Sequence, residues 1–224
     1  LQMTFPEDEG MSGQRKALYE AVYASGNAAQ RQLAANSLAS IAIQEDRTED
    51  ARRYLEETEG RTEDAALLRI QLEQKMGEND KALEEIQKQL YRAVSQALQM
   101  LMMLMETKED AREALEIAKI YRRVEAIFAV GGGMSAGLLM QQYMVMGRKK
   151  EALDCLTQMV DALVGKPMTP NPMLFNPTFK PKADWRDAGR ELRTALLRGL
   201  KEDETLSSLR GEKEYEDAVG WRRA

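Results

Sequence analysis

A short pattern recurs four times along this chain of 224 residues. In each copy an apolar stretch reaches a turn, an alanine follows the turn position by five residues, and a large aliphatic residue lies four residues beyond the alanine. The turn positions are Asp46, Gly77, Glu106 and Gly147; the alanines are Ala51, Ala82, Ala111 and Ala152; the aliphatic residues are Leu55, Ile86, Leu115 and Leu156. Recurrence at a period of roughly 20 to 50 residues is typical of stacked helical hairpins.

Helix packing explains why an alanine stands at the start of the second helix of each hairpin. A small side chain at the start of the second helix lets the two backbones of a hairpin approach closely. The aliphatic residue four positions on lies one turn further along the same helix face. The pattern therefore predicts close helix crossings at all four sites.

Helical spacing dominates the chain, and no stretch keeps the alternation of a strand. We predict an all-α fold: an irregular right-handed stack of antiparallel helical hairpins over residues 1–164, a proline-rich strap over 165–182 and a C-terminal helical cap over 183–224 packed on the same domain. Expected helices cover residues 12–25, 27–44, 48–59, 62–76, 79–105, 108–130, 134–146, 148–164, 183–201 and 212–221. The helix from Asn79 is either continuous or broken near residues 92–96.

The proposed strap holds five of the six prolines, which excludes a helix there. It also carries four large apolar residues, Met173, Leu174, Phe175 and Phe179. We expect these four side chains to fasten the strap to the helical stack.

Composition narrows the function. Histidine is absent, which removes the commonest general base and the commonest transition-metal ligand. A single cysteine, Cys155, excludes an internal disulfide framework and suits a reducing cytoplasm; we expect it to be a small buried residue. The net charge of −5 is not that of a nucleic-acid-binding domain. We predict no catalytic, cofactor-binding or metal site.

The sequence contains no recognisable membrane-spanning segment or targeting signal. The longest apolar run, residues 100–105, is far shorter than the roughly 20 residues that cross a bilayer, and no signal peptide is visible. We therefore expect a cytoplasmic protein without membrane contact. Because the chain begins with Leu1, we expect a fragment or a processed product.

The four segments resemble tetratricopeptide-type repeats. Leu38, Leu98 and Leu139 match the leucine of that family's first helix, Tyr143 matches its tyrosine, and two of the turn positions are glycine. The alanines are 31, 29 and 41 residues apart, where the family has about 34. The resemblance implies an array whose concave face grips a peptide or protein, with irregular crossing angles.

A second, diffuse resemblance covers nearly the whole chain. A helical stack, a proline-bearing insertion, one more helix and a closing LSSLRGEKEYEDAV look like the C-terminal regulatory part of XRE-type (lambda-repressor-like) helix-turn-helix regulators. That likeness implies a region that senses a peptide or protein and dimerises. DNA would be bound only through a domain preceding Leu1.

Carried over by position, the concave face would present amides and methionines. These side chains adapt to varied peptide partners. The candidate partner-binding residues are Asn36, Ser40, Gln71, Gln74, Gln96, Met100, Met103, Gln141 and Met144. The alternative is that the amides are only solvated and the methionines belong to the core.

The run Met100–Met105 is too continuous for one helix face. A helix that is apolar all round is buried all round, so we expect the central helix of the stack here. The alternative is a contact with another subunit. A homodimer is expected on separate grounds, because two-fold dimers are the commonest oligomers and the resembled regulators dimerise.

Two further features allow a functional interpretation. Gly131, Gly132 and Gly133 interrupt helicity and are interpreted as a hinge before the fourth repeat, with an anion-binding nest as the alternative. A basic stripe of Lys182, Arg186, Arg190 and Arg193 recurs at helical spacing. It is interpreted as a solvated face, and the alternatives are docking to an acidic partner or weak phosphate contact.

Together these observations favour the peptide- or protein-sensing and oligomerisation region of a bacterial transcription regulator. The hinge would couple a change of curvature to the spacing of attached DNA-binding domains. A free-standing adaptor that scaffolds protein partners is the second hypothesis. An enzyme that uses carboxylates in the groove is the third.

Overall fold

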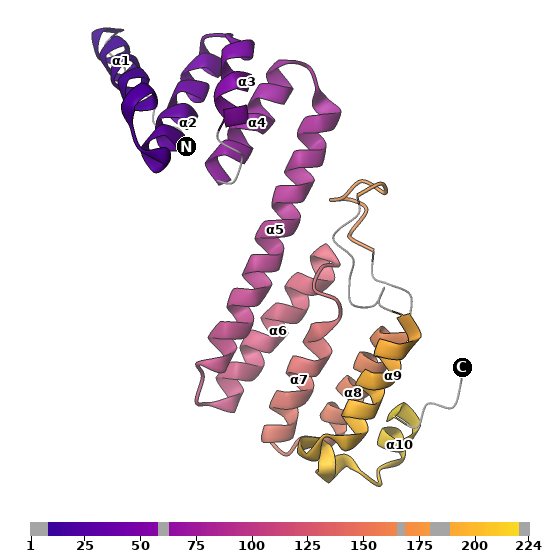
Figure 1. The fold of residues 1–224 in the computed structure, drawn as a ribbon. Helices are drawn as coiled ribbons and strands as arrows, with labels where there is room; N and C mark the ends of the chain where they lie inside the picture. Colours follow the sequence, from indigo (N-terminus) through magenta and orange to yellow (C-terminus); the bar gives the residue numbers. More distant parts are fainter. Residues whose placement is uncertain (1–8, 58–62, 165–168, 180–188, 220–224) are drawn as a thin grey trace. The chain divides into compact units, whose positions relative to one another are not determined.

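The computed structural model describes residues 9–57, 63–164, 169–179 and 189–219. Within these ranges every regular element is a helix and no strand is present, which confirms the all-α prediction (Figure 1). The helices are α1 (Glu9–Ser25), α2 (Ala28–Gln44), α3 (Thr48–Glu57), α4 (Glu63–Lys75), α5 (Asn79–Glu106), α6 (Ala111–Phe128), α7 (Met134–Val145), α8 (Lys149–Val164), α9 (Gly189–Glu202), the 3-10 helix η2 (Glu204–Leu209) and α10 (Lys213–Val219).

Most of the expected boundaries lie within a few residues of the observed ones. Asn27 caps α2: its side chain accepts from the Gln30 N–H while the Gln30 side chain accepts from the Asn27 N–H. The first helix begins three residues earlier than expected, at Glu9 and not at residue 12. The helix η2 was not anticipated, and α5 is continuous over 28 residues.

Three of the four repeated turns share one geometry. Asp46, Gly77 and Gly147 all have positive φ, at 59°, 75° and 69°. At each turn the N–H of the next residue reaches back to the carbonyl five positions earlier: Arg47 to Ala42, Glu78 to Glu73 and Arg148 to Tyr143. This is the hydrogen-bond pattern of a helix ending in a left-handed residue, and it explains why glycine occupies two of the three positions.

The third turn is different. Residues 107–110 connect α5 to α6 without a left-handed residue, and Asp110 caps α6 by accepting from the Arg112 N–H at 2.8 Å. The helix therefore begins at Ala111 and not three residues earlier. Ala111 is half-buried, whereas the other three repeat alanines are buried. The paired helices pack on each other at two of these buried sites, where α2 meets α3 and α7 meets α8.

The chain divides into two compact units, residues 1–89 and 90–224. In unit 1, α2 packs against α1, α3 and α4, and α3 also packs against α4. Its core is built around Leu38, Leu55 and Leu72 with small residues such as Ala39 and Ala51 at the closest approaches. Edge-to-face packing of Tyr23 on Tyr54, with ring centroids 5.3 Å apart, joins α1 to α3.

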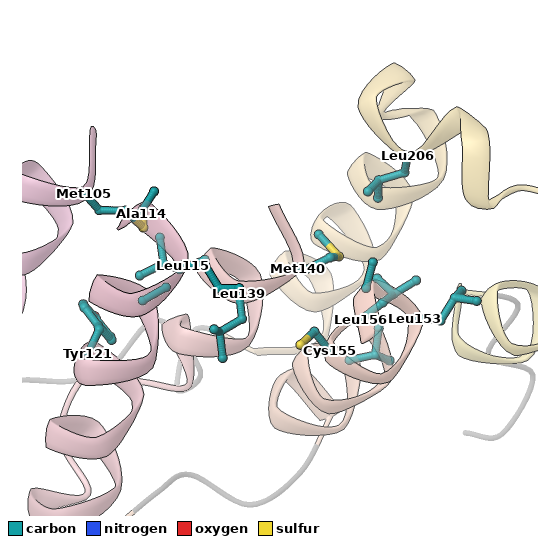
Figure 2. Packing of buried hydrophobic residues seen from close by; sticks show 14 of the residues in the cluster. Met105, Ala114, Leu115, Tyr121, Leu139, Met140, Leu153, Cys155, Leu156 and Leu206 are labelled. Carbon is teal, nitrogen blue, oxygen red and sulfur yellow. The ribbon is translucent and has the colours of Figure 1, made fainter. Parts of the chain in front are cut away.

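Unit 2 has the larger core. It gathers side chains from α5, α6, α7 and α8, and it extends to the C-terminal elements through Leu206 and Leu209 (Figure 2). Leu139, Leu156, Leu206 and Leu209 are almost completely buried. Residues of the C-terminal elements therefore form part of this core, and α10 packs on α8 and α9.

The described part of the strap, residues 169–179, is fastened to unit 2 as predicted, but by three of the four expected side chains. Phe175 is buried, and Leu174 and Phe179 pack partly into the core. Phe175 and Phe179 form an aromatic cluster with Tyr91 of α5, with centroids 5.1–6.3 Å apart. Met173 is 89% exposed and was wrongly included.

Asn171 of the strap binds the C-terminal end of α6. Its side-chain amide donates to the Ile127 carbonyl at 2.7 Å, and its backbone N–H donates to the Phe128 carbonyl at 3.1 Å. Carbonyls at a helix C-terminus have no partner inside the helix, so these bonds tie the strap to a fixed place.

Cys155 is buried in the unit 2 core, as expected, and burial raises the pKa of its thiol (Figure 2). Because the thiolate is the reactive form, we expect the native protein to react with Ellman's reagent at pH 8 at least tenfold more slowly than the urea-unfolded protein. Equal rates in the two states would contradict this placement.

Candidate functional site

The methionine run of α5 is not buried all round, which corrects our expectation for residues 100–105. Met100 is 69% exposed, and Met103 and Leu104 are also exposed, whereas Met105 is buried. Gln142 of α7 donates its amide N–H toward the Met105 sulfur at 3.9 Å. The run therefore has one side in the core and one side on the surface.

Helical geometry explains which side is which. At about 100° per residue, Val94, Leu98 and Met105 share one side of α5, and these three residues are buried. Gln96, Met100 and Met103 share the opposite side and are exposed. These three predicted residues therefore lie on one side of α5 and point away from the unit 2 core.

The next helix, α6, also has one buried side and one exposed side. Ala114, Ala118 and Tyr121 lie in the core, and Ile120 and Ile127 lie on the other side of the helix and are exposed. The helices α5 and α6 follow each other in the chain, both contribute buried residues to the unit 2 core, and both carry large apolar side chains that are exposed. We call Met100, Met103, Leu104, Ile120 and Ile127 the outer face.

The outer face is unusual for a surface because α5 contributes no charge to it. From Ala93 to Met105 the helix has no acidic or basic residue. On α6, Glu116 and Arg123 are exposed and flank Ile120. Glu116 pairs with Lys119 at 2.6 Å, and Arg123 pairs with no acid in the described ranges. Exposed apolar clusters rimmed by polar groups mark interaction sites.

The remaining partner-binding candidates are distributed over other places. Gln71 and Gln74 are exposed on α4 of unit 1, and Gln141 is exposed on α7 of unit 2. Ser40 is half-buried. Asn36 is 8% exposed, so a partner could not reach its side chain without rearrangement, and Met144 packs partly into the core.

The three glycines between α6 and α7 surround a buried carboxylate. Glu125 of α6 is 4% exposed and accepts hydrogen bonds from the N–H groups of Gly133, Met134 and Ser135 at 2.7, 3.0 and 3.3 Å. Positive φ values at Gly131 and Gly133 bring these donors into place. The nest that the glycines form thus holds an anion from the chain itself, at the positive end of α7.

The Glu125 carboxylate also contributes to the raised pKa of Tyr121, which lies one helical turn earlier. Burial, with a smaller contribution from the Glu125 charge, raises the pKa of Tyr121 to about 12. The pair is therefore a structural element of the unit 2 core. The hinge interpretation of the three glycines stays a prediction, and the loop it concerns carries three hydrogen bonds to one side chain.

The basic stripe lies outside what the structure describes. Lys182 and Arg186 fall in the undescribed residues 180–188, and the side chains of Arg190 and Arg193 on α9 are not described. In the described ranges no cluster of three or more acidic, cysteine or histidine residues could hold a metal ion. None of the helices described there is long and apolar enough to cross a bilayer.

Sequence reasoning missed Leu104, Ile120, Ile127 and Glu125. Ile120 and Ile127 are seven residues apart and lie opposite the core positions of α6, which a helical projection could have shown. Leu104 lies within a run that looked uniformly buried. Nothing local distinguishes Glu125 from the many exposed glutamates, because its partners lie eight to ten residues further along the chain.

Comparison with known proteins finds no matching family, no matching curated sequence and no matching solved structure.

Proposed function

We propose that this chain is a protein-interaction region made of tetratricopeptide-like helical hairpins, and that the outer face of α5 and α6 is its contact surface. The carrying observation is the set of five exposed large apolar side chains on two adjacent helices. Burying such side chains against a partner yields roughly 25 cal/mol per Å² of apolar area, whereas leaving them in water yields nothing.

The hairpin packing supports the tetratricopeptide-like part of the proposal. In such arrays the first helix of a pair contacts its own second helix and the first helix of the next pair. In unit 1, α2 contacts α3 and α4, and α3 contacts α4. In unit 2, α7 contacts α6 before it and α8 after it. The three left-handed turns give these units a common geometry.

The biological setting follows from the sequence resemblance. We propose that the region senses a peptide or protein and oligomerises for a transcription regulator whose DNA-binding domain would precede Leu1. A gel-shift assay of the full gene product on its own promoter tests this setting. Absence of DNA binding, with protein binding intact, would make the chain an adaptor.

A photo-crosslinker tests the contact surface even while the partner is unidentified. We expect p-benzoylphenylalanine at Met100 or Ile120 to give a crosslinked product of defined mass in cells. Asp154, an exposed residue of α8, is the matched control and should give none. No product from either outer-face position, in a correctly folded protein, would refute the proposed function.

A further inference from the structure

We propose that the partner of the outer face is a second copy of this chain, packed about a two-fold axis that passes beside Ile120. This inference rests on the function proposed above and names the occupant of the same surface. In the arrangement α6 lies antiparallel on α6 of its mate, and α5 lies antiparallel on α5 of its mate.

The charges of α6 are self-complementary in this arrangement. Glu116 and Arg123 lie four residues before and three residues after Ile120, on the exposed side of the helix. An antiparallel pairing centred there places Glu116 of one copy beside Arg123 of the other, twice. Arg123, which has no acid partner within the described ranges, gains one in the dimer. Glu113, further along the same side, would meet Ile127 of the mate and no second acid.

The α5 surface is also compatible with itself. A two-fold contact sets the same patch against itself, so any uncompensated charge would repel its own copy. The span from Ala93 to Met105 has no charge to repel. The exposed polar residues of this stretch, Gln96 and Gln99, can donate and accept hydrogen bonds with identical amides. A charged peptide would gain no complementary charge from α5.

Side-chain size supports the same direction of packing. The exposed small residues Ala93 and Ala97 occupy the first half of this stretch, and Met100, Met103 and Leu104 occupy the second half. Antiparallel contact puts the large half of one helix on the small half of the other. Alternation of large and small side chains across a contact is how packed helix interfaces fill space.

Sedimentation velocity over a concentration series tests the proposal with the purified chain. We expect a concentration-dependent dimer whose dissociation constant rises at least tenfold in Ile120→Glu. The matched control is Val145→Glu, which adds the same charge at another exposed apolar residue of unit 2 and should leave the constant within twofold. Circular dichroism of both variants checks that the helices remain formed.

A charge-reversal cycle tests the two-fold geometry itself. Glu116→Arg places two arginines together and should raise the dissociation constant at least threefold. Adding Arg123→Glu to the same chain restores opposite charges and should return the constant to within twofold of the original value. A heterologous contact would show no such rescue.

Three results would overturn the inference: a monomer at every concentration, a dimer indifferent to Ile120→Glu, or a double reversal no tighter than the single one. The proposed function fails separately. A monomeric chain that still crosslinks through Met100 to a different protein would keep the contact surface and remove the second copy as its occupant.

Discussion

Replacing Glu125 with alanine is expected to lower the free energy of unfolding of unit 2 by about 3 kcal/mol or more. The substitution leaves the buried N–H group of Ser135 and the partly buried N–H groups of Gly133 and Met134 without their acceptor. A fully buried unsatisfied donor costs about 1–3 kcal/mol, and a partly buried one costs less. It also removes a negative charge from the N-terminus of α7, which contributes up to about 2 kcal/mol in a partly buried geometry. Urea unfolding followed by circular dichroism measures the change.

A conservative variant and a surface control make this prediction specific. Glu125→Gln keeps one acceptor oxygen and loses the charge, so we expect an effect about half as large. Asp154→Ala removes an exposed acid from α8 and should change stability by less than about 0.5 kcal/mol. Hydrogen exchange at the amides of residues 133–135 should accelerate only in the Glu125 variants. A Glu125→Ala protein as stable as Asp154→Ala would show that the carboxylate does not hold the loop.

Replacing Phe175 with alanine should cost about 3 kcal/mol, because a buried aromatic side chain is removed and a cavity is left beside Tyr91 and Phe179. Met173→Ala, two residues earlier in the same strap, is the matched control. Since Met173 is exposed, its loss should change the unfolding free energy by less than about 0.5 kcal/mol.

The same urea titration distinguishes the two strap variants. We expect a lower midpoint for Phe175→Ala with a clear change in near-ultraviolet circular dichroism, which reports the packing of the aromatic cluster. Identical midpoints for both variants would mean that the strap contributes nothing to the stability of unit 2.

The turns were the most predictable part of the fold. Asp46, Gly77 and Gly147 stand at one fixed distance before an alanine, and all three adopt the left-handed conformation that ends a helix. This follows from local chemistry: glycine tolerates positive φ without a steric cost, and aspartate tolerates it better than most residues. The third turn departs because Glu106 has neither property, and Asp110 supplies a cap in its place.

The candidate surface was only partly predictable. Gln96, Met100 and Met103 were placed together because residues three or four apart share a helix side. Whether that side faced the core was undetermined, because the run from Met100 to Met105 is apolar in every direction. The contribution of Ile120 and Ile127 depends on which helix packs beside α5, and hydrophobic spacing alone does not carry that information.

The sequence by itself determined the all-helical class and the left-handed turns, since each depends on residues close together in the chain. Tertiary structure decided that one side of the methionine run stays on the surface and that Glu125 is buried at the start of α7. The reason is physical: burial and hydrogen bonding of a side chain depend on neighbours from other helices, and a local pattern specifies only which way the side chain points along its own helix.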